Sequence, residues 1–144
     1  MLIDDDKPEF KIAANGTWFH NGEPIRRAAL ARLFSDRALK IDENGRYWLA
    51  TPFEKYPVEV EDVPYIIVDY EVKGADINLR TNMDEIVRLG PEYPFELRGG
   101  VPYIEVRQGL YAKLARSVYY NMVEKFGATV QSRGGIYNLG ERDE

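Results

Sequence analysis

The sequence predicts an α+β protein built from two similar small units, each a mostly antiparallel sheet with one main helix. Three observations lead to this fold class. With 44% apolar residues, the 144-residue chain can bury a substantial core. Short segments rich in β-branched and aromatic residues alternate with Gly, Asn and Pro turns, which is typical of strands. Two longer stretches carry apolar residues at helical spacing, and each is followed by a hairpin pattern.

In the first half, residues 1–15 form a ragged segment without a predicted element. Thr17–His20 has strand propensity and stops at the turn pair Asn21–Gly22. Pro24 suits the first turn of a helix, which we expect from Ile25 to Arg37. Further strands are predicted at Leu39–Asp42, Tyr47–Thr51, Val58–Glu61 and Tyr65–Val72.

The second half contains the strongest helical pattern, Leu110–Phe126, in which one wide face is apolar and the opposite face is polar. Gly127 follows it as a residue suited to a helix C-terminus. Strands are predicted before this helix at Asp76–Arg80, Ile86–Leu89, Phe95–Arg98 and Tyr103–Arg107, and after it at Ala128–Gln131 and Ile136–Leu139.

An internal repeat supports the division into two units. Four residues after the first helix recur at the same mutual spacing after the second, namely Ala38, Gly45, Tyr47 and Leu49 against Ala128, Gly135, Tyr137 and Leu139. We therefore expect an N-terminal unit at 16–74 and a C-terminal unit at 75–144. Each would leave an apolar face to cover, so we expect the units to pack together and form a cleft suited to a small molecule.

Composition narrows the classes of function. A net charge of −5 argues against general nucleic-acid binding and against polybasic attachment to membranes. The absence of cysteine excludes disulfides, thiol nucleophiles and thiolate zinc sites, and it fits the cytoplasm. From its acidic start we expect no signal peptide, and no apolar run in the sequence is long enough to span a membrane. Nothing in the sequence predicts a cofactor or a metal centre.

The residues that could support catalysis are few. His20 is the only histidine, and no nucleophile elbow or phosphate-binding glycine loop accompanies it. Glu59, Glu61 and Asp62 form the densest carboxylate cluster. They could hold a magnesium ion or act as an acid–base pair. A solvated strand face explains the same alternation, and we favour that interpretation.

Candidate ligand-binding residues stand at the ends of predicted strands. Arg80, Thr81 and Asn82 offer a guanidinium, a hydroxyl and an amide to a phosphate group, although a capped turn would use the same residue types. Arg107 and Arg32 are further candidates for an anion. Tyr47 and Trp48 could give a stacking surface, or they could belong to the core. Thr51 and Glu54 would lie at the lip of the cleft.

Several short motifs together resemble a bacterial family called domain of unknown function 1285, over about residues 16–140. These motifs are Trp18-Phe19, Gly22-x-Pro24-Ile25, Leu33-Phe34, Tyr47-Trp48-Leu49, Thr51-Pro52-x-Glu54, Val60-Glu61-Asp62-x-Pro64, Arg80-Thr81-Asn82, Gly90-Pro91, Val106-Arg107-x-Gly109-Leu110 and Gly134-Gly135. The resemblance implies a duplicated core, a C-terminal unit superficially like a pleckstrin-homology fold, and a nucleotide-like ligand at the interface of the units. It implies no catalytic residue.

We therefore expect a non-catalytic ligand-binding or sensing protein with a role in signal transduction. Its ligand would be a small, anionic, nucleotide-like molecule held where the two units meet. One alternative is a protein-interaction module that uses a strand edge or a helix groove. The other is a magnesium-dependent hydrolase built on Glu59, Glu61 and Asp62.

Overall fold

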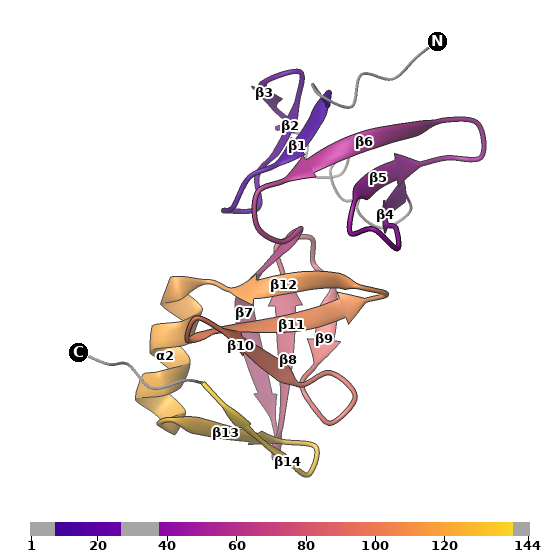
Figure 1. Cartoon of the computed structure of the whole chain (residues 1–144). Helices are drawn as coiled ribbons and strands as arrows, with labels where there is room; N and C mark the ends of the chain where they lie inside the picture. Colours follow the sequence, from indigo (N-terminus) through magenta and orange to yellow (C-terminus); the bar gives the residue numbers. More distant parts are fainter. Residues whose placement is uncertain (1–7, 27–37, 140–144) are drawn as a thin grey trace. The chain divides into compact units, whose positions relative to one another are not determined.

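The chain folds into two compact units that divide between Pro64 and Tyr65 (Figure 1). The structure, a computed structural model, describes residues 8–26 and 38–139. The helix expected at Ile25–Arg37 falls almost wholly outside the described residues. The boundary expected between Gly74 and Ala75 lies instead before Tyr65, because Gly74 and Ala75 form the turn of a hairpin inside the second unit and not a linker.

The first unit is a six-stranded sheet with the strand order β3-β2-β1-β6-β5-β4. Its central strands β1 and β6 are parallel, and the other neighbours are antiparallel. Phe10 and Ile12 of β1 are buried, so part of the segment expected to be ragged is a core strand. The strands are β1 (Phe10–Ile12), β2 (Trp18–His20), β3 (Glu23–Pro24), β4 (Leu39–Ile41), β5 (Tyr47–Ala50) and β6 (Lys55–Val60).

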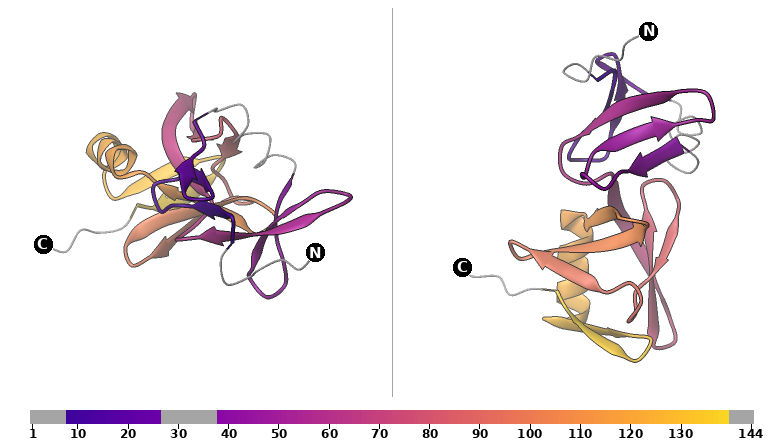
Figure 2. Two further views of the ribbon diagram at one scale, coloured as in Figure 1. Left: turned by 90° about the horizontal axis from the view of Figure 1, so that it is seen from above. Right: turned by 45° about the vertical axis from the view of Figure 1, so that its right-hand side comes forward.

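The second unit contains a sheet of the same kind, in the order β10-β11-β12-β7-β8-β9. Helix α2 (Arg116–Phe126) follows the sheet, lies beside β7 and precedes a separate hairpin (Figures 1 and 2). The second unit therefore resembles a pleckstrin-homology fold superficially, because both consist of a curled sheet followed by a helix. The strands are β7 (Tyr65–Lys73), β8 (Asp76–Thr81), β9 (Ile86–Arg88), β10 (Phe95–Arg98), β11 (Val101–Arg107), β12 (Leu110–Leu114), β13 (Thr129–Ser132) and β14 (Gly135–Asn138).

The two units are similar because β1–β6 and β7–β12 follow the same path. In each, two three-stranded antiparallel meanders join through a central parallel pair, β1 with β6 and β7 with β12. Even the bond that closes this pair recurs. Glu61 donates its N–H to the carbonyl of Ile12, and Ala115 donates to that of Ile67, both at 3.0 Å.

The elements that correspond are not those expected from the sequence. The strand order makes the hairpin β4–β5 equivalent to β10–β11, whereas β13–β14 forms a two-stranded sheet of its own. The shared Gly and Tyr spacing reflects what hairpins have in common.

The strand β12 corrects the prediction of a helix from Leu110 to Phe126. Leu110, Ala112 and Leu114 are buried at alternate positions, and β12 pairs with both β11 and β7. The apolar spacing of this segment suits a helix and a strand equally, and a neighbour on each side decides for the strand. The helix therefore begins only at Arg116, after Ala115.

Candidate functional site

The predicted site residues fall into two groups, one in each unit. Tyr47, Trp48, Thr51 and Glu54 belong to the β5–β6 hairpin of the first unit. The second unit holds Arg107 and the consecutive residues 80–82. Arg32 lies outside the described residues. The cleft shared by the units stays a prediction, so each group is described within its own unit.

Arg80 already has two carboxylate partners. Its guanidinium lies 3.2 Å from Asp69 and 3.2 Å from Asp84, with 41% of its side chain exposed. The N–H of Tyr70, followed by Arg80, holds the pKa of Asp69 below its ordinary value. Exposed ion pairs of this kind contribute little to stability, because solvent screens them. Arg80 is therefore a surface ion-pair residue whose charge is locally balanced.

Thr81 and Asn82 form a capped turn, the structural alternative to a phosphate site. Thr81 is fully buried, and its hydroxyl accepts the N–H groups of Met83 and Glu85 at 3.1 and 3.2 Å. Asn82 bonds Ile66 twice: its side-chain oxygen accepts the N–H of Ile66 and its own N–H donates to the carbonyl of Ile66. The three-residue motif thus closes the β8–β9 turn and ties it to β7, and a buried Thr81 does not reach a ligand.

Glu85 brings this turn together with Arg107. The Arg107 guanidinium pairs with one oxygen of Glu85 and donates to the hydroxyl of Tyr65 at 2.9 Å. Desolvation works against the charge of Arg107, but its interactions with Tyr65 and Glu85 outweigh it and raise the Arg107 pKa. The other carboxylate oxygen of Glu85 is buried without a hydrogen-bond partner. The sequence prediction placed Arg107 and residues 80–82 together, and they do meet, but through a carboxylate that balances the charge.

In the first unit, Trp48 lies among cations on the sheet face opposite the core. The register pairs Trp48 with Lys40 on one side and Pro57 on the other, so these side chains share a face. The ammonium group of Lys55 lies 4.1 Å from the centre of the indole ring, and the guanidinium carbon of Arg46 lies 5.4 Å from it. We call Lys40, Arg46, Trp48 and Lys55 the Trp48 surface.

Asp42 fixes the orientation of this indole. One carboxylate oxygen accepts the Trp48 Nε1–H at 3.0 Å, and the other accepts the N–H groups of Asn44 and Arg46, both at 2.9 Å. The bond from Trp48 and the backbone bond from Arg46 lower the pKa of Asp42. Tyr47 points to the opposite, core-facing side with Ile41 and Val58. The expected stacking surface is therefore restricted to Trp48.

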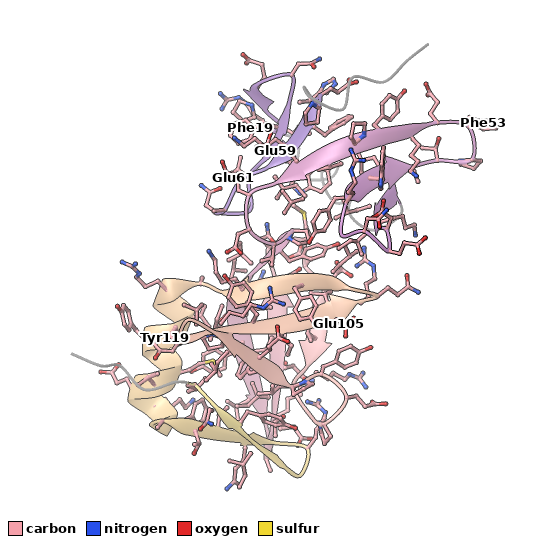
Figure 3. The ribbon with its side chains drawn as sticks, viewed as in Figure 1. Phe19, Phe53, Glu59, Glu61, Glu105 and Tyr119 are labelled. Atoms are coloured by element: carbon pink, nitrogen blue, oxygen red, sulfur yellow. The ribbon has the colours of Figure 1, made fainter. Side chains whose placement is uncertain are left out.

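Thr51 and Glu54 form the turn at the end of the β5–β6 hairpin. The Thr51 hydroxyl accepts the N–H groups of Phe53 and Glu54 at 3.2 and 2.9 Å. Between them, Phe53 is 93% exposed, and Figure 3 shows it at the tip of the hairpin. Thr51 therefore has a structural role, and it holds an aromatic side chain out in solvent.

The carboxylates considered for magnesium do not form a metal site. Glu61 pairs with Lys11 at 3.0 Å and accepts the N–H of Ala14 at 2.8 Å, and these contacts lower its pKa, with the Ala14 bond first. Glu59 lies on the central strand β6 and Glu61 just after it, and both side chains are exposed (Figure 3). Within residues 8–26 and 38–139, no three acidic or histidine side chains gather closely enough to hold a metal ion.

An open groove of about 510 Å³ lies in the second unit between β7 and α2. Its lining comes from Asp69, Tyr70 and Val72 on the strand and from Ser117, Val118, Asn121 and Lys125 on the helix. The Tyr70 hydroxyl donates to Asn121 across it at 2.5 Å. We call this the β7–α2 groove. Sequence reasoning missed it because it placed both β12 and α2 in one helix.

Sequence reasoning also missed most of the Trp48 surface. Lys40 and Lys55 belong to other strands than Trp48, and nothing in their spacing along the sequence relates them to it. The strict alternation along β5 could have placed Arg46 on the Trp48 side. Lys40 and Lys55 needed the pairing register.

Comparison with known proteins places the chain in a family. The family described as "Domain of unknown function (DUF1285), N-terminal domain" matches residues 4–63, and "Protein of unknown function (DUF1285), C-terminal domain" matches residues 64–139. No helix in the described part of the chain is long and apolar enough to cross a membrane. No curated protein matches the chain.

Two crystal structures of related proteins have the same fold. A DUF1285 family protein from Silicibacter pomeroyi DSS-3 is 31% identical, with a TM-score of 0.80 over 93% of this chain and 80% of that one. Another from Shewanella baltica OS155 is 33% identical, with a TM-score of 0.68 over 83% of this chain and 93% of that one. On the matches to both domains and to these structures, the chain belongs to the DUF1285 family.

Proposed function

We propose that this protein is a non-catalytic ligand-binding protein that senses an anionic, nucleotide-like small molecule, and that it acts in signal transduction. The ligand would bind the first unit at the Trp48 surface. The observation that supports this most directly is a half-buried indole, held in place by Asp42, with Lys40, Arg46 and Lys55 around it on one sheet face.

The energetics favour a ligand that combines a ring with an anion. A cation over an exposed indole contributes about 0.5–1 kcal/mol. A charge-assisted hydrogen bond to phosphate is worth about 1.5–3 kcal/mol. Lys55 is exposed and has a flexible stem, so it can leave the ring for a phosphate group and expose the indole to a base. Lys40 and Lys55 form no ion pair with any other described residue.

The arginines of the second unit are less suited to this role. Arg80 is balanced by Asp69 and Asp84, and Arg107 by Glu85. An anion would have to displace carboxylates that are already in place. We therefore base the proposal on the first unit.

Tryptophan fluorescence tests the proposal, because the chain has only two tryptophans and Trp18 is 2% exposed. Titration with ADP should quench the Trp48 emission saturably. Pyrophosphate, which has the charge but no ring, should compete with ADP while quenching little. The Trp48→Phe variant should lose the ADP-dependent change and keep the Trp18 signal.

Charge variants provide the matched control. Lys55→Ala should weaken ADP binding about tenfold, the loss of one charge-assisted contact. Lys73→Ala removes another exposed lysine, from the second unit, and should leave the affinity unchanged. Equal affinity in wild type and Lys55→Ala, or no saturable response to ADP, GDP or a cyclic nucleotide, would remove the Trp48 surface as the site.

A further inference from the structure

The outer edge of β7 is unpaired over half of its length. β12 pairs with β7 only at Tyr65–Ile67, whereas β8 pairs with it as far as Lys73. The bond from Ala115 to the carbonyl of Ile67 is the last on that side, because α2 then begins and leaves the sheet. Within the described residues, no strand pairs with Val68–Lys73 on the side away from β8. We call this the β7 edge.

The direction of the backbone groups along this edge follows from one hydrogen bond. Tyr70 donates its N–H to the carboxylate of Asp69 at 2.8 Å, so that N–H is not part of the β7–β8 ladder. In an antiparallel pair, each residue turns both its backbone groups toward the same neighbour, and the direction alternates along the strand. Val72 therefore also turns its N–H and carbonyl toward the open side.

The β7–α2 groove runs along this same edge. Val72 is 41% exposed although its cross-strand partner Ile77 is buried on the same face. Across the groove, Ser117, Asn121 and Lys125 recur every fourth residue and so form one polar row of α2. This polar row of α2 faces the exposed Val72, so the space between α2 and β7 is not filled by core side chains.

We propose that the second unit binds an extended segment of a partner protein, which adds to the β7 edge as a further strand inside the β7–α2 groove. Its backbone would bond the outward groups of Val72 and the carbonyl of Tyr70. Strand addition to an open sheet edge is a common mode of peptide recognition, in which pockets for alternate side chains set specificity.

Charge and hydrophobicity define the chemistry of that segment. Side chains on its inner face would meet Val72 and Val118 and should be apolar. Those on its outer face would lie beside Glu71, which alternates with the groove-lining Tyr70 and Val72 along the strand, and should be Lys or Arg. Glu71 is 63% exposed, and its contact with the exposed Lys73 is long, at 3.9 Å. Its carboxylate can therefore accept a basic side chain of the peptide as a closer partner.

A second copy of this chain is a poorer occupant. Two β7 edges can pair their outward residues Tyr70 and Val72 about a two-fold axis at Glu71. That arrangement places the two Glu71 carboxylates opposite each other, which is destabilising.

A substitution that removes one edge N–H tests the proposal. Peptides selected from a random display library on the full-length chain should alternate basic and apolar residues. Val72→Pro deletes the outward N–H and leaves the β7–β8 ladder bonds in place, so the variant should remain folded. It should weaken the selected peptides about tenfold or more. Val72→Thr keeps the N–H and a β-branched side chain and should retain binding.

Amide chemical shifts locate the bound peptide. Adding it should shift amides of β7 and α2 and slow hydrogen exchange at Val72. Selection of no peptide, or equal binding to Val72→Pro, would overturn the proposal. So would a wild-type dimer that Val72→Pro dissociates, because a second copy would then cover the edge. ADP binding at the Trp48 surface should be the same in Val72→Pro, which separates this test from that of the proposed function.

Discussion

Asp42 connects the turn of a hairpin to the side chain of the candidate ligand site. The same carboxylate closes the β4–β5 turn through two backbone N–H groups and holds the indole of Trp48 through the third bond. Each of these bonds favours the ionised form of Asp42. Local folding and the orientation of the indole therefore depend on one charge.

We predict that Trp48 responds to acid through Asp42. The folded-state pKa of Asp42 is lowered from its ordinary value of 3.8, so its stabilising effect is complete above 3.8 and disappears as the pH falls through the lower, folded-state value. Fluorescence during an acid titration should show a transition below 3.8 in the wild type that is missing in Asp42→Asn. Superimposable profiles would show that Asp42 does not control the indole.

At the scale of elements, the hairpin β13–β14 is attached by side chains that bond the backbone of the sheet. Ser132 is fully buried, and its hydroxyl donates to the carbonyl of Leu89 at 2.6 Å and accepts the N–H of Ile77 at 2.9 Å. Arg133 donates to the carbonyls of Ile77 and Leu89 at 3.0 and 3.1 Å. These side-chain bonds attach the hairpin to the start of β8 and to the residue after β9, and the hairpin does not extend their sheet.

Removing the Ser132 hydroxyl should loosen this attachment. Ser132→Ala leaves the Ile77 N–H buried without its acceptor, which should cost about 1–3 kcal/mol of unfolding free energy. Urea denaturation measures the change. Ser117→Ala, which removes an exposed hydroxyl from α2, should change stability by less than about 0.5 kcal/mol. Equal stability of the two variants would mean that the hairpin is held by other contacts.

Sequence patterns predicted most strands, the two-unit α+β class and the family, because turn residues and alternation are local signals. They were wrong for Leu110–Leu114, where the neighbours β7 and β11 make a strand of a segment with helical apolar spacing. They paired the wrong hairpins, since only strand order shows which elements correspond. Residues 80–82 are common to phosphate sites and to capped turns, and burial of Thr81 decides for the turn. Strand register, the identity of neighbouring strands and the burial of a side chain all depend on residues far apart in the sequence. The strand at Leu110–Leu114, the pairing of the hairpins and the role of Thr81 could therefore not be predicted from local patterns.

For the molecule as a whole, the repeated path β1–β6 and β7–β12 means that each unit is organised around its own parallel pair. Ile12 and Ile67 occupy the same place in the two units, and both are fully buried. Each unit therefore has a core of its own, which predicts that a fragment cut at the unit boundary can fold alone.

Two fragments of the second unit distinguish the observed boundary from the one expected from the sequence. Residues 65–144 keep β7 between β12 and β8, whereas residues 75–144 lack it and leave both neighbours unpaired. The shorter fragment also loses the buried Tyr65, Ile66 and Ile67. Side chains of this size contribute about 1.5–3 kcal/mol each when buried, and their sum is comparable with the whole stability of a small domain, about 5–15 kcal/mol.

Circular dichroism and amide spectra should therefore show a cooperative thermal transition and dispersed resonances for 65–144, and neither for 75–144. A native-like 75–144 would mean that β7 is dispensable and would return the boundary to Gly74. A disordered 65–144 would mean that the second unit needs the first in order to fold, because the core around Tyr65 and Ile67 would then be insufficient by itself.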